Sequence, residues 1–173
     1  MFGCDDGDLS IHSQENLQYE MCGGKASANP DLSIETANSM IKLLAQEDKS
    51  YRAAIFSASK FDAEPQLITE VIVAFQMNEK NRCKFQLPEQ TSQLIPCIIM
   101  VATRPTIYLL NATKDLADAV KHDKQPHEDT VIQHFSISPM FVPEGDDMLS
   151  KNARLEIFKC YATFKKFVVQ VDE

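Results

Sequence analysis

Glycine is scarce in this sequence, and its few glycines form no recognised phosphate-binding loop. Five glycines occur among 173 residues, and four of them lie within the first 30 residues. None belongs to a GxGxxG dinucleotide fingerprint or to a GxxxxGKS/T phosphate loop, and the chain has no GxSxG motif. These absences exclude the usual nucleotide-binding signatures and the nucleophile elbow of α/β-hydrolases.

Regularly spaced cysteine pairs and long apolar runs are also lacking. The five cysteines are an odd number without a CxxC pair, so we interpret them as free thiols. Apolar runs such as Ile98 to Ala102 are far shorter than the roughly 20 residues needed to span a bilayer. Acidic residues stand near the N-terminus, where a signal peptide needs basic ones. We therefore expect an intracellular protein, cytoplasmic or nuclear, that does not span a membrane.

Basic residues are outnumbered by acidic ones. The chain has 25 Asp and Glu against 17 Lys and Arg, which gives a net charge of -8. A negative chain repels the phosphate backbone unless its basic residues gather on one face, so nucleic acid is disfavoured as a partner. The apolar share of 44% is ordinary for a globular domain, and the length suffices for one core without a disulfide or a metal.

The first 30 residues differ in pattern from the rest of the chain. They contain the breakers Gly23-Gly24 and Asn29-Pro30 and little apolar periodicity, so we expect an irregular N-terminal arm over residues 1–30. Residues 31–173 alternate between helical and strand-like patterns. This alternation predicts a single α/β domain with a mixed central sheet, flanking helices and a long C-terminal amphipathic helix.

Apolar spacing places four helices and five strands. The predicted helices cover 33–48, 63–79, a segment capped by Thr113, and Leu149 to Val169. The predicted strands are Tyr51 to Ala58, Cys83 to Leu87, Cys97 to Ala102, Ile107 to Leu110 and Thr130 to Ile137. A polar loop from Pro88 to Gln93 and a turn from Thr103 to Thr106 flank the first of the two central strands.

The closing helix has an apolar and a basic face. Its predicted inward residues are Ile157, Phe158, Tyr161, Phe164 and Val168, and its polar face carries Lys151, Arg154, Lys159, Lys165 and Lys166. Such a basic face is typical of a solvated surface helix, and it could also meet an acidic partner.

Two kinds of side chain suggest local chemistry. His122 and His127 lie among carboxylates and could hold a transition metal, but polar residues around Pro126 are also what a solvated turn contains. Cys97 lies in the most apolar strand, where burial raises a thiol's pKa, and Cys160 lies on the closing helix. Both cysteines are therefore interpreted first as core residues.

One succession of elements resembles part of a known fold. A predicted strand ends at Ser57 to Lys60, the predicted helix 63–79 follows, and the apolar strand Cys97 to Ala102 comes next. Over residues 50–110 this order is similar to the second half of the core of PD-(D/E)XK nuclease-like domains. The stretch from Ile95 onward is also similar to fungal proteins of uncharacterised function.

The resemblance implies a divalent-metal site, with Mg²⁺ as the ion. In that family two carboxylates and a lysine hold the metal and orient water for phosphodiester hydrolysis. Lys60 matches the lysine, and Glu64, Glu70 or Asp31 would supply carboxylates, but Ala58 stands where the family has an acid. If the fold is of this type, the chain is expected to be an inactive relative.

Three hypotheses of function follow from the sequence. The first is a non-catalytic, intracellular protein-interaction domain without a cofactor, because no complete catalytic motif is present. The second is a Mg²⁺-dependent nuclease or other hydrolase that uses Lys60 with Glu64, Glu70 or Asp31. The third is a cysteine-dependent hydrolase, whose base would be one of the four histidines.

Overall fold

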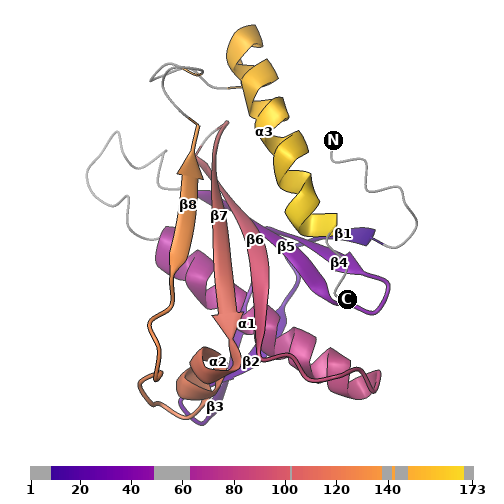
Figure 1. Ribbon diagram of the computed structural model, residues 1–173, viewed down its shortest axis with the longest axis vertical. Coiled ribbons are helices and arrows are strands. Elements are labelled where there is room, and N and C mark those ends of the chain that lie inside the picture. The colour runs from indigo at the N-terminus through magenta and orange to yellow at the C-terminus, as the bar shows by residue number, and fades with distance from the viewer. Residues whose placement is uncertain (1–8, 49–62, 102, 138–141, 143–147, 170–173) are drawn as a thin grey trace.

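A six-stranded mixed sheet with helices on both faces forms the centre of the structure (Figure 1). This computed structural model describes residues 9–48, 63–101, 103–137, 142 and 148–169. Its strands are β1 (Leu9–Ser13), β2 (Leu17–Met21), β3 (Gly24–Ala28), β4 (Leu32–Thr36), β5 (Ile41–Asp48), β6 (Ser92–Val101), β7 (Arg104–Thr113) and β8 (Ile132–Ser136). Its helices are α1 (Ala63–Lys84), α2 (Lys114–Lys121) and α3 (Lys151–Val169). The predicted α/β class, with a mixed sheet and a long C-terminal helix, is confirmed.

The strand order is β1-β4-β5-β6-β7-β8, and β2 pairs with β3 in a separate hairpin. Neighbours in the large sheet are antiparallel except β5 and β6, which are parallel. A parallel pair needs a long crossover connection, and α1 lies in the connection from β5 to β6. No helix within the described residues is long and apolar enough to cross a membrane.

The predicted central hairpin is confirmed as β6 and β7. The two strands pair in register from Ser92 opposite Thr113 to Val101 opposite Arg104. The strands are longer than expected, because Arg104 to Thr106, predicted as turn, already belong to β7. Both faces of this hairpin are apolar because helices cover both faces of the sheet.

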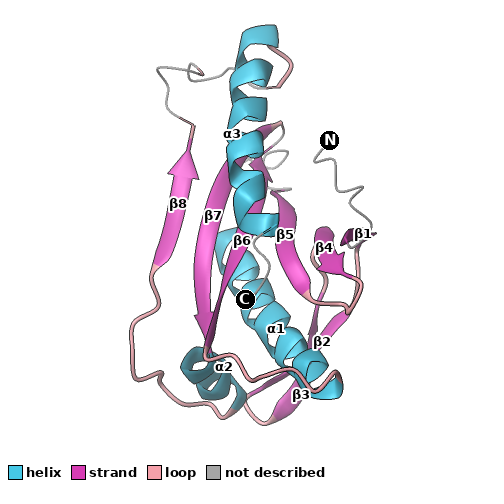
Figure 2. Ribbon diagram, turned by 45° about the vertical axis from the view of Figure 1, so that its right-hand side comes forward, coloured by secondary structure: helices cyan, strands magenta, loops and turns pink. Residues whose placement is uncertain are grey.

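The core is divided by the sheet into two layers. Leu44, Cys97 and Ile99 face α1, where they meet Val71 and Phe75. The next residues along the same strands point to the opposite face, since side chains alternate along a strand. There a second layer forms against α3, made of Leu43, Ile98, Ile107, Leu109, Phe164 and Val168. Figure 2 shows α3 running along this face of the sheet.

Two side-chain amides on α1 bond to strand backbone. The Asn78 side chain accepts from Ile41 N at 2.7 Å and donates to Ile41 O at 2.9 Å. Gln76 does the same for Glu20 in β2, with distances of 3.0 and 3.1 Å. Each amide thus pairs with a strand as a neighbouring strand would, and α1 is fixed against both β5 and the β2–β3 hairpin.

The prediction of an irregular arm over residues 1–30 is wrong for residues 9–28, which form three strands. Cys22 and Gly23 make a two-residue turn between β2 and β3 with φ of 49° and 72°. Positive φ at both turn positions is the geometry of a tight hairpin turn whose twist matches that of its strands. Leu17 and Tyr19 then bury their side chains against α1, which gives the hairpin its stability.

The predicted helix 33–48 is also wrong, because this segment forms most of β4 and all of β5. Ser39 has φ of 54°, and its backbone N–H donates to Thr36 O in the turn between the strands. The carbonyl of Ser39 accepts from the Asn81 side chain on α1. Ile34, Met40 and Leu44 are buried because both faces of this sheet are covered. Their spacing matched the period of a helix by coincidence.

The predicted strand Cys83 to Leu87 is wrong because α1 continues to Lys84. The helix ends when Gln86 adopts φ of 56°, and Leu87 N donates to Arg82 O while Gln86 N donates to Cys83 O. This pair of bonds is a Schellman cap. The predicted loop from Pro88 gives way to β6 at Ser92, and the predicted strand Tyr51 to Ala58 lies outside the described residues.

The remaining helix predictions are confirmed with one correction. Helix 63–79 is present as part of α1, and Thr113 caps α2 by accepting from Leu116 N at 3.2 Å. Thr130 to Ile137 contains β8. On α3, Phe158 was expected to face inward, but its side chain is 46% exposed because it lies outside the stripe that contacts the sheet.

We expect Asn78→Ala to lower the free energy of unfolding by about 3 kcal/mol, because it leaves the buried Ile41 N–H without its side-chain acceptor and removes the shorter of the two side-chain hydrogen bonds to the Ile41 carbonyl. Urea denaturation measures this change. The matched control is Asn81→Ala, which removes an exposed amide that donates to Ser39 O and should cost about 1 kcal/mol. Equal losses in the two variants would contradict the role given to Asn78.

Candidate functional site

The structure brings together two of the four residues predicted for a nuclease site. Glu70 is buried on α1, and the Asp31 carboxylate before β4 is close enough to influence its charge. Glu64 lies six residues earlier on the same helix, which is about 240° around the axis, and is exposed. Lys60 and the neighbouring Ala58 lie outside the described residues.

Glu70 lines a cavity of about 300 Å³ between α1 and the end of β3. The other lining residues are Ser27, Ala28, Asn29, Gln66 and Thr69. Gln66 donates from its side-chain amide to Glu70 Oε1 at 3.0 Å. Glu70 Oε2 is buried and has no hydrogen-bond partner in the part of the chain that the structure describes. Only 1% of the residue is exposed, so this oxygen is an unpaired acceptor that is shielded from solvent.

The pKa of Glu70 is raised to about 7, because burial raises it by more than the Gln66 hydrogen bond lowers it, and the negative charge of Asp31 adds to the rise. Glu70 occupies the helix face that also carries Leu67, Val71 and Ala74, all in the core. Its position in the periodic pattern is therefore that of a core residue, and its carboxyl has lost most of its hydration.

Three of the four described cysteines, Cys22, Cys97 and Cys160, are held away from the thiolate form that a nucleophile needs. Burial raises the pKa of the Cys97 thiol, which is fully buried, and nearby Glu70 raises it further. Burial also raises the pKa of Cys22 and Cys160. These environments give no support to the cysteine-dependent hydrolase.

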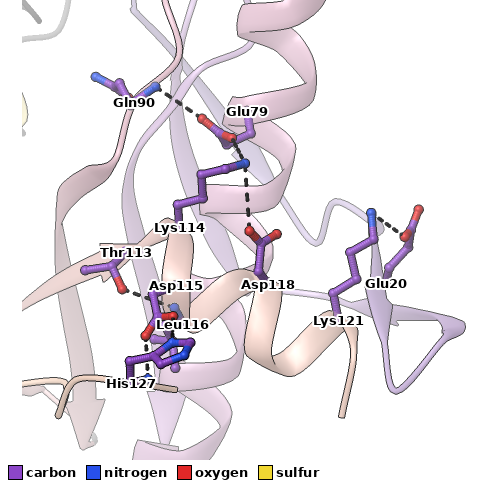
Figure 3. A network of polar contacts seen from close by, with 10 residues as sticks. All are labelled: Glu20, Glu79, Gln90, Thr113, Lys114, Asp115, Leu116, Asp118, Lys121 and His127. Carbon is purple, nitrogen blue, oxygen red and sulfur yellow. Dashed lines mark hydrogen bonds and ion pairs between the residues drawn. The ribbon is translucent and has the colours of Figure 1, made fainter. Parts of the chain in front are cut away.

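The predicted metal-site histidines occupy separate positions around the end of α2. His127 Nδ1 lies 2.6 Å from Asp115 Oδ1, and the His127 backbone N–H donates to Asp115 Oδ2 at 2.7 Å (Figure 3). His122 is the C-cap residue of α2. No group of three or more His, Cys, Asp or Glu side chains among the described residues is placed to hold a metal ion. The Asp115 pair ties the loop to the first turn of α2 and raises the pKa of His127.

A network of charged side chains joins α1, α2 and the β2–β3 hairpin (Figure 3). Lys114 lies 3.6 Å from Glu79 and 3.9 Å from Asp118, and Lys121 lies 2.8 Å from Glu20. These pairs are largely exposed, and exposed ion pairs contribute little to stability. Because positive and negative groups neutralise each other here, the network is interpreted as structural.

A second cavity, of about 450 Å³, is an apolar groove between β7, β8 and α3 that we name the β8–α3 groove. Its apolar lining residues are Ile107, Leu109, Phe135, Ile137, Phe164 and Phe167, and Glu156, Lys159, Cys160 and Thr163 complete it. Phe135 is 53% exposed and Phe167 is 38% exposed. Two partly exposed aromatic rings beside an apolar cavity form an unusual surface for a globular chain.

Sequence reasoning did not find the β8–α3 groove. Phe135 was assigned to a strand and Phe164 to a helix face, but their proximity depends on how α3 packs across the sheet. The alternation from Thr130 to Ile137 gave no sign that β8 lies at the edge of the sheet. By contrast, Glu70 was named from the sequence, but as a carboxylate of a nuclease site together with Lys60. In the structure its side chain bonds to Gln66 instead.

Comparison with models of known protein families, with curated proteins and with solved structures finds no match to this chain.

The pKa of Glu70 predicts how stability changes with pH. The folded-state value of about 7 lies above the ordinary value of 4.5, so the folded state retains a proton that the unfolded chain releases. Stability contributed by protonated Glu70 is therefore present below about pH 4.5 and is lost as the pH rises to about 7.

We expect Glu70→Gln to remove this loss, because the amide stays neutral at every pH. Relative to wild type, the variant should gain about 3 kcal/mol of unfolding free energy between about pH 4 and pH 8. Urea denaturation at the two pH values measures the change, with Glu64→Gln as an exposed control that should follow wild type. Parallel pH profiles for Glu70→Gln and wild type would show that Glu70 is not buried as described.

Proposed function

We propose that this chain is a non-catalytic protein-interaction domain that binds its partner in the β8–α3 groove. The observation that supports this most strongly is the pair of partly exposed rings, Phe135 and Phe167, at an apolar groove beside the edge strand β8. The free cysteines of the described chain, Cys22, Cys83, Cys97 and Cys160, support an intracellular location.

The edge position of β8 favours an extended partner segment. β8 bonds to β7 on one side, and no described strand bonds to its other edge. The backbone N–H and C=O groups of an open edge can pair with an added strand, and pockets for alternate side chains then give specificity.

The register between β7 and β8 supports this proposal. Phe135 lies directly opposite Ile107, and Gln133 lies opposite Leu109, so these four side chains share one face of the sheet. Ile107 and Leu109 belong to the core layer on the α3 side. Every second residue of an added strand would therefore face the groove, and apolar residues there would cover Phe135.

Charge favours an acidic partner. α3 carries five basic side chains, Lys151, Arg154, Lys159, Lys165 and Lys166, against the single acid Glu156, so its net charge is +4. The whole chain has a net charge of -8, which leaves -12 on the remaining residues. A partner that reaches α3 with Asp or Glu flanking its apolar residues would be attracted to this helix.

A second copy of the chain fits this surface less well. Pairing two β8 edges about a two-fold axis would bring the basic helices of both copies to the same interface, where like charges repel. The nuclease alternative has narrower support, because the described residues bring only Asp31 and Glu70 together. We therefore favour an acidic, apolar segment of another protein.

Selection from a library of random peptides of about ten residues, the length of a long strand, tests the proposal. We expect enrichment of peptides that alternate apolar with acidic residues. Fluorescence anisotropy should show that Phe135→Ser weakens their binding by roughly tenfold or more, because the buried ring loses its apolar contact.

Phe158→Ser is the matched control, because this exposed ring on α3 does not line the groove. It should leave the affinity of the selected peptides unchanged. Equal weakening by both substitutions, or enrichment of basic peptides alone, would contradict the proposed surface. A dimer that dissociates in Phe135→Ser would assign the groove to a second copy instead.

A further inference from the structure

The outer side of α3 is a second surface that points to a partner. The helix packs on the rest of the chain through its opposite side, which contains Ile157, Phe164 and Val168. Figure 2 shows α3 in front of the sheet, and no described element covers its outer side there. The outward face of α3, as we name it, consists of the exposed residues Lys151, Arg154, Leu155, Phe158, Lys159, Ala162 and Lys166.

Three apolar residues run along the middle of the outward face. Leu155, Phe158 and Ala162 are spaced i, i+3 and i+7, which places them within about 60° of one another around the helix axis. Leu155 is 58% exposed and Phe158 is 46% exposed. Single exposed apolar side chains are ordinary on a protein surface, but an exposed stripe with charged borders is typical of an interaction site.

Basic side chains border this apolar stripe on both sides. At 100° per residue, Arg154 lies about 70° to one side of the middle of the stripe, and Lys159 and Lys166 lie about 50–70° to the other side. Lys151 continues the line of the stripe at the start of the helix. Glu156, the one acid of α3, lines the β8–α3 groove and pairs with Lys159. The outward face therefore contains positive charge and no acid of the helix.

Charge and apolar content together favour a bilayer surface as the partner. A second copy of the chain would bring two basic faces together, and like charges repel. A phosphate backbone would attract the basic side chains but would leave the apolar stripe in water. At a bilayer with anionic headgroups, apolar side chains enter the boundary with the acyl chains, while Lys and Arg extend to the phosphates. Clusters of four to eight Lys and Arg on an amphipathic helix are typical of such binding.

The negative charge of the other residues does not prevent this contact. Although the residues outside α3 have a net charge of -12, charges more than about 8 Å from the surface are largely screened at physiological salt. The inner side of α3 stays packed on the sheet, so the helix presents its outward face without any unfolding.

We propose that the outward face of α3 binds the surface of a bilayer that contains anionic phospholipids, with Leu155 and Phe158 entering the headgroup boundary. The helix lies in the plane of the surface and does not cross it. Anionic lipids face the cytoplasm, which agrees with the expected intracellular location. The site does not depend on the proposed function of the β8–α3 groove, with which it shares only Lys159.

Co-sedimentation of the whole chain with vesicles of phosphatidylcholine and about one third phosphatidylserine tests the proposal. We expect binding that weakens as salt is raised and that falls at least tenfold on pure phosphatidylcholine. Lys151→Glu should weaken binding by roughly tenfold or more, since each basic side chain near an anionic surface contributes about fivefold. Phe158→Ser should weaken it by roughly tenfold. The matched controls, Lys124→Glu in an exposed loop and Phe135→Ser in the groove, should bind as wild type does.

The absence of tryptophan from the sequence allows a direct test of insertion. Phe158→Trp introduces a single indole on the outward face, and its fluorescence should shift to shorter wavelength when phosphatidylserine vesicles are added. The indole of Phe135→Trp, which lies in the groove, should not shift.

The proposal is overturned if the chain binds pure phosphatidylcholine equally well, if Lys151→Glu and Phe158→Ser bind as wild type does, or if both indoles shift alike. Two further ligands identify a different partner. A DNA duplex of about 20 base pairs that binds in the absence of vesicle binding, equally to wild type and Phe158→Ser, would assign the basic residues to nucleic acid. An acidic amphipathic helical peptide that binds in place of vesicles, and is weakened by Phe158→Ser, would assign the face to a protein.

Discussion

The pairing of the Asn78 side chain with the backbone of Ile41 is the interaction on which the rest of the structure depends. It occupies both the N–H and the carbonyl of the first residue of β5, and the same amide donates to Gln93 at the start of β6. One side chain thus fixes α1 relative to both strands of the parallel pair. Gln76 extends this arrangement to Glu20, which places the β2–β3 hairpin over the helix. Buried amides whose oxygen and nitrogen are both hydrogen-bonded favour one packing, because another would leave them unpaired.

The cavity beside Glu70 and the β8–α3 groove follow from this arrangement and lie on opposite faces of the sheet. On the α1 side, fixing the hairpin brings the end of β3 beside Glu70, and a cavity lined by Ser27, Asn29 and Glu70 remains there. On the other side, α3 packs on β5 to β7 but leaves Phe135 partly exposed, and an apolar groove remains along β8. Burying Glu70 opposes folding at neutral pH, since its pKa is raised to about 7.

Sequence patterns predicted those helices and strands whose own residues determine which of their side chains are buried. The β6–β7 hairpin is apolar on both faces, and Leu67, Val71 and Phe75 repeat at helical spacing, so both elements were found. Segment 33–48 was missed because its turn is held by Asn81, 42 residues away from Ser39. The candidate sites were harder to predict from the sequence than the helices and strands. Glu70 could be named as a carboxylate, but its unpaired oxygen depends on the hairpin, and the groove depends on the crossing of α3 over the sheet.

The central claim is that the open edge of β8 receives an extended, acidic and apolar segment. Amide hydrogen exchange of the chain, with and without a saturating peptide of that composition, measures this at the backbone itself. An added strand would bond to those amides of Ile132–Ser136 that pair with no described strand and would slow their exchange, while the amides of β1 at the opposite edge would be unchanged. Unchanged exchange throughout β8 in the presence of bound peptide would contradict the account.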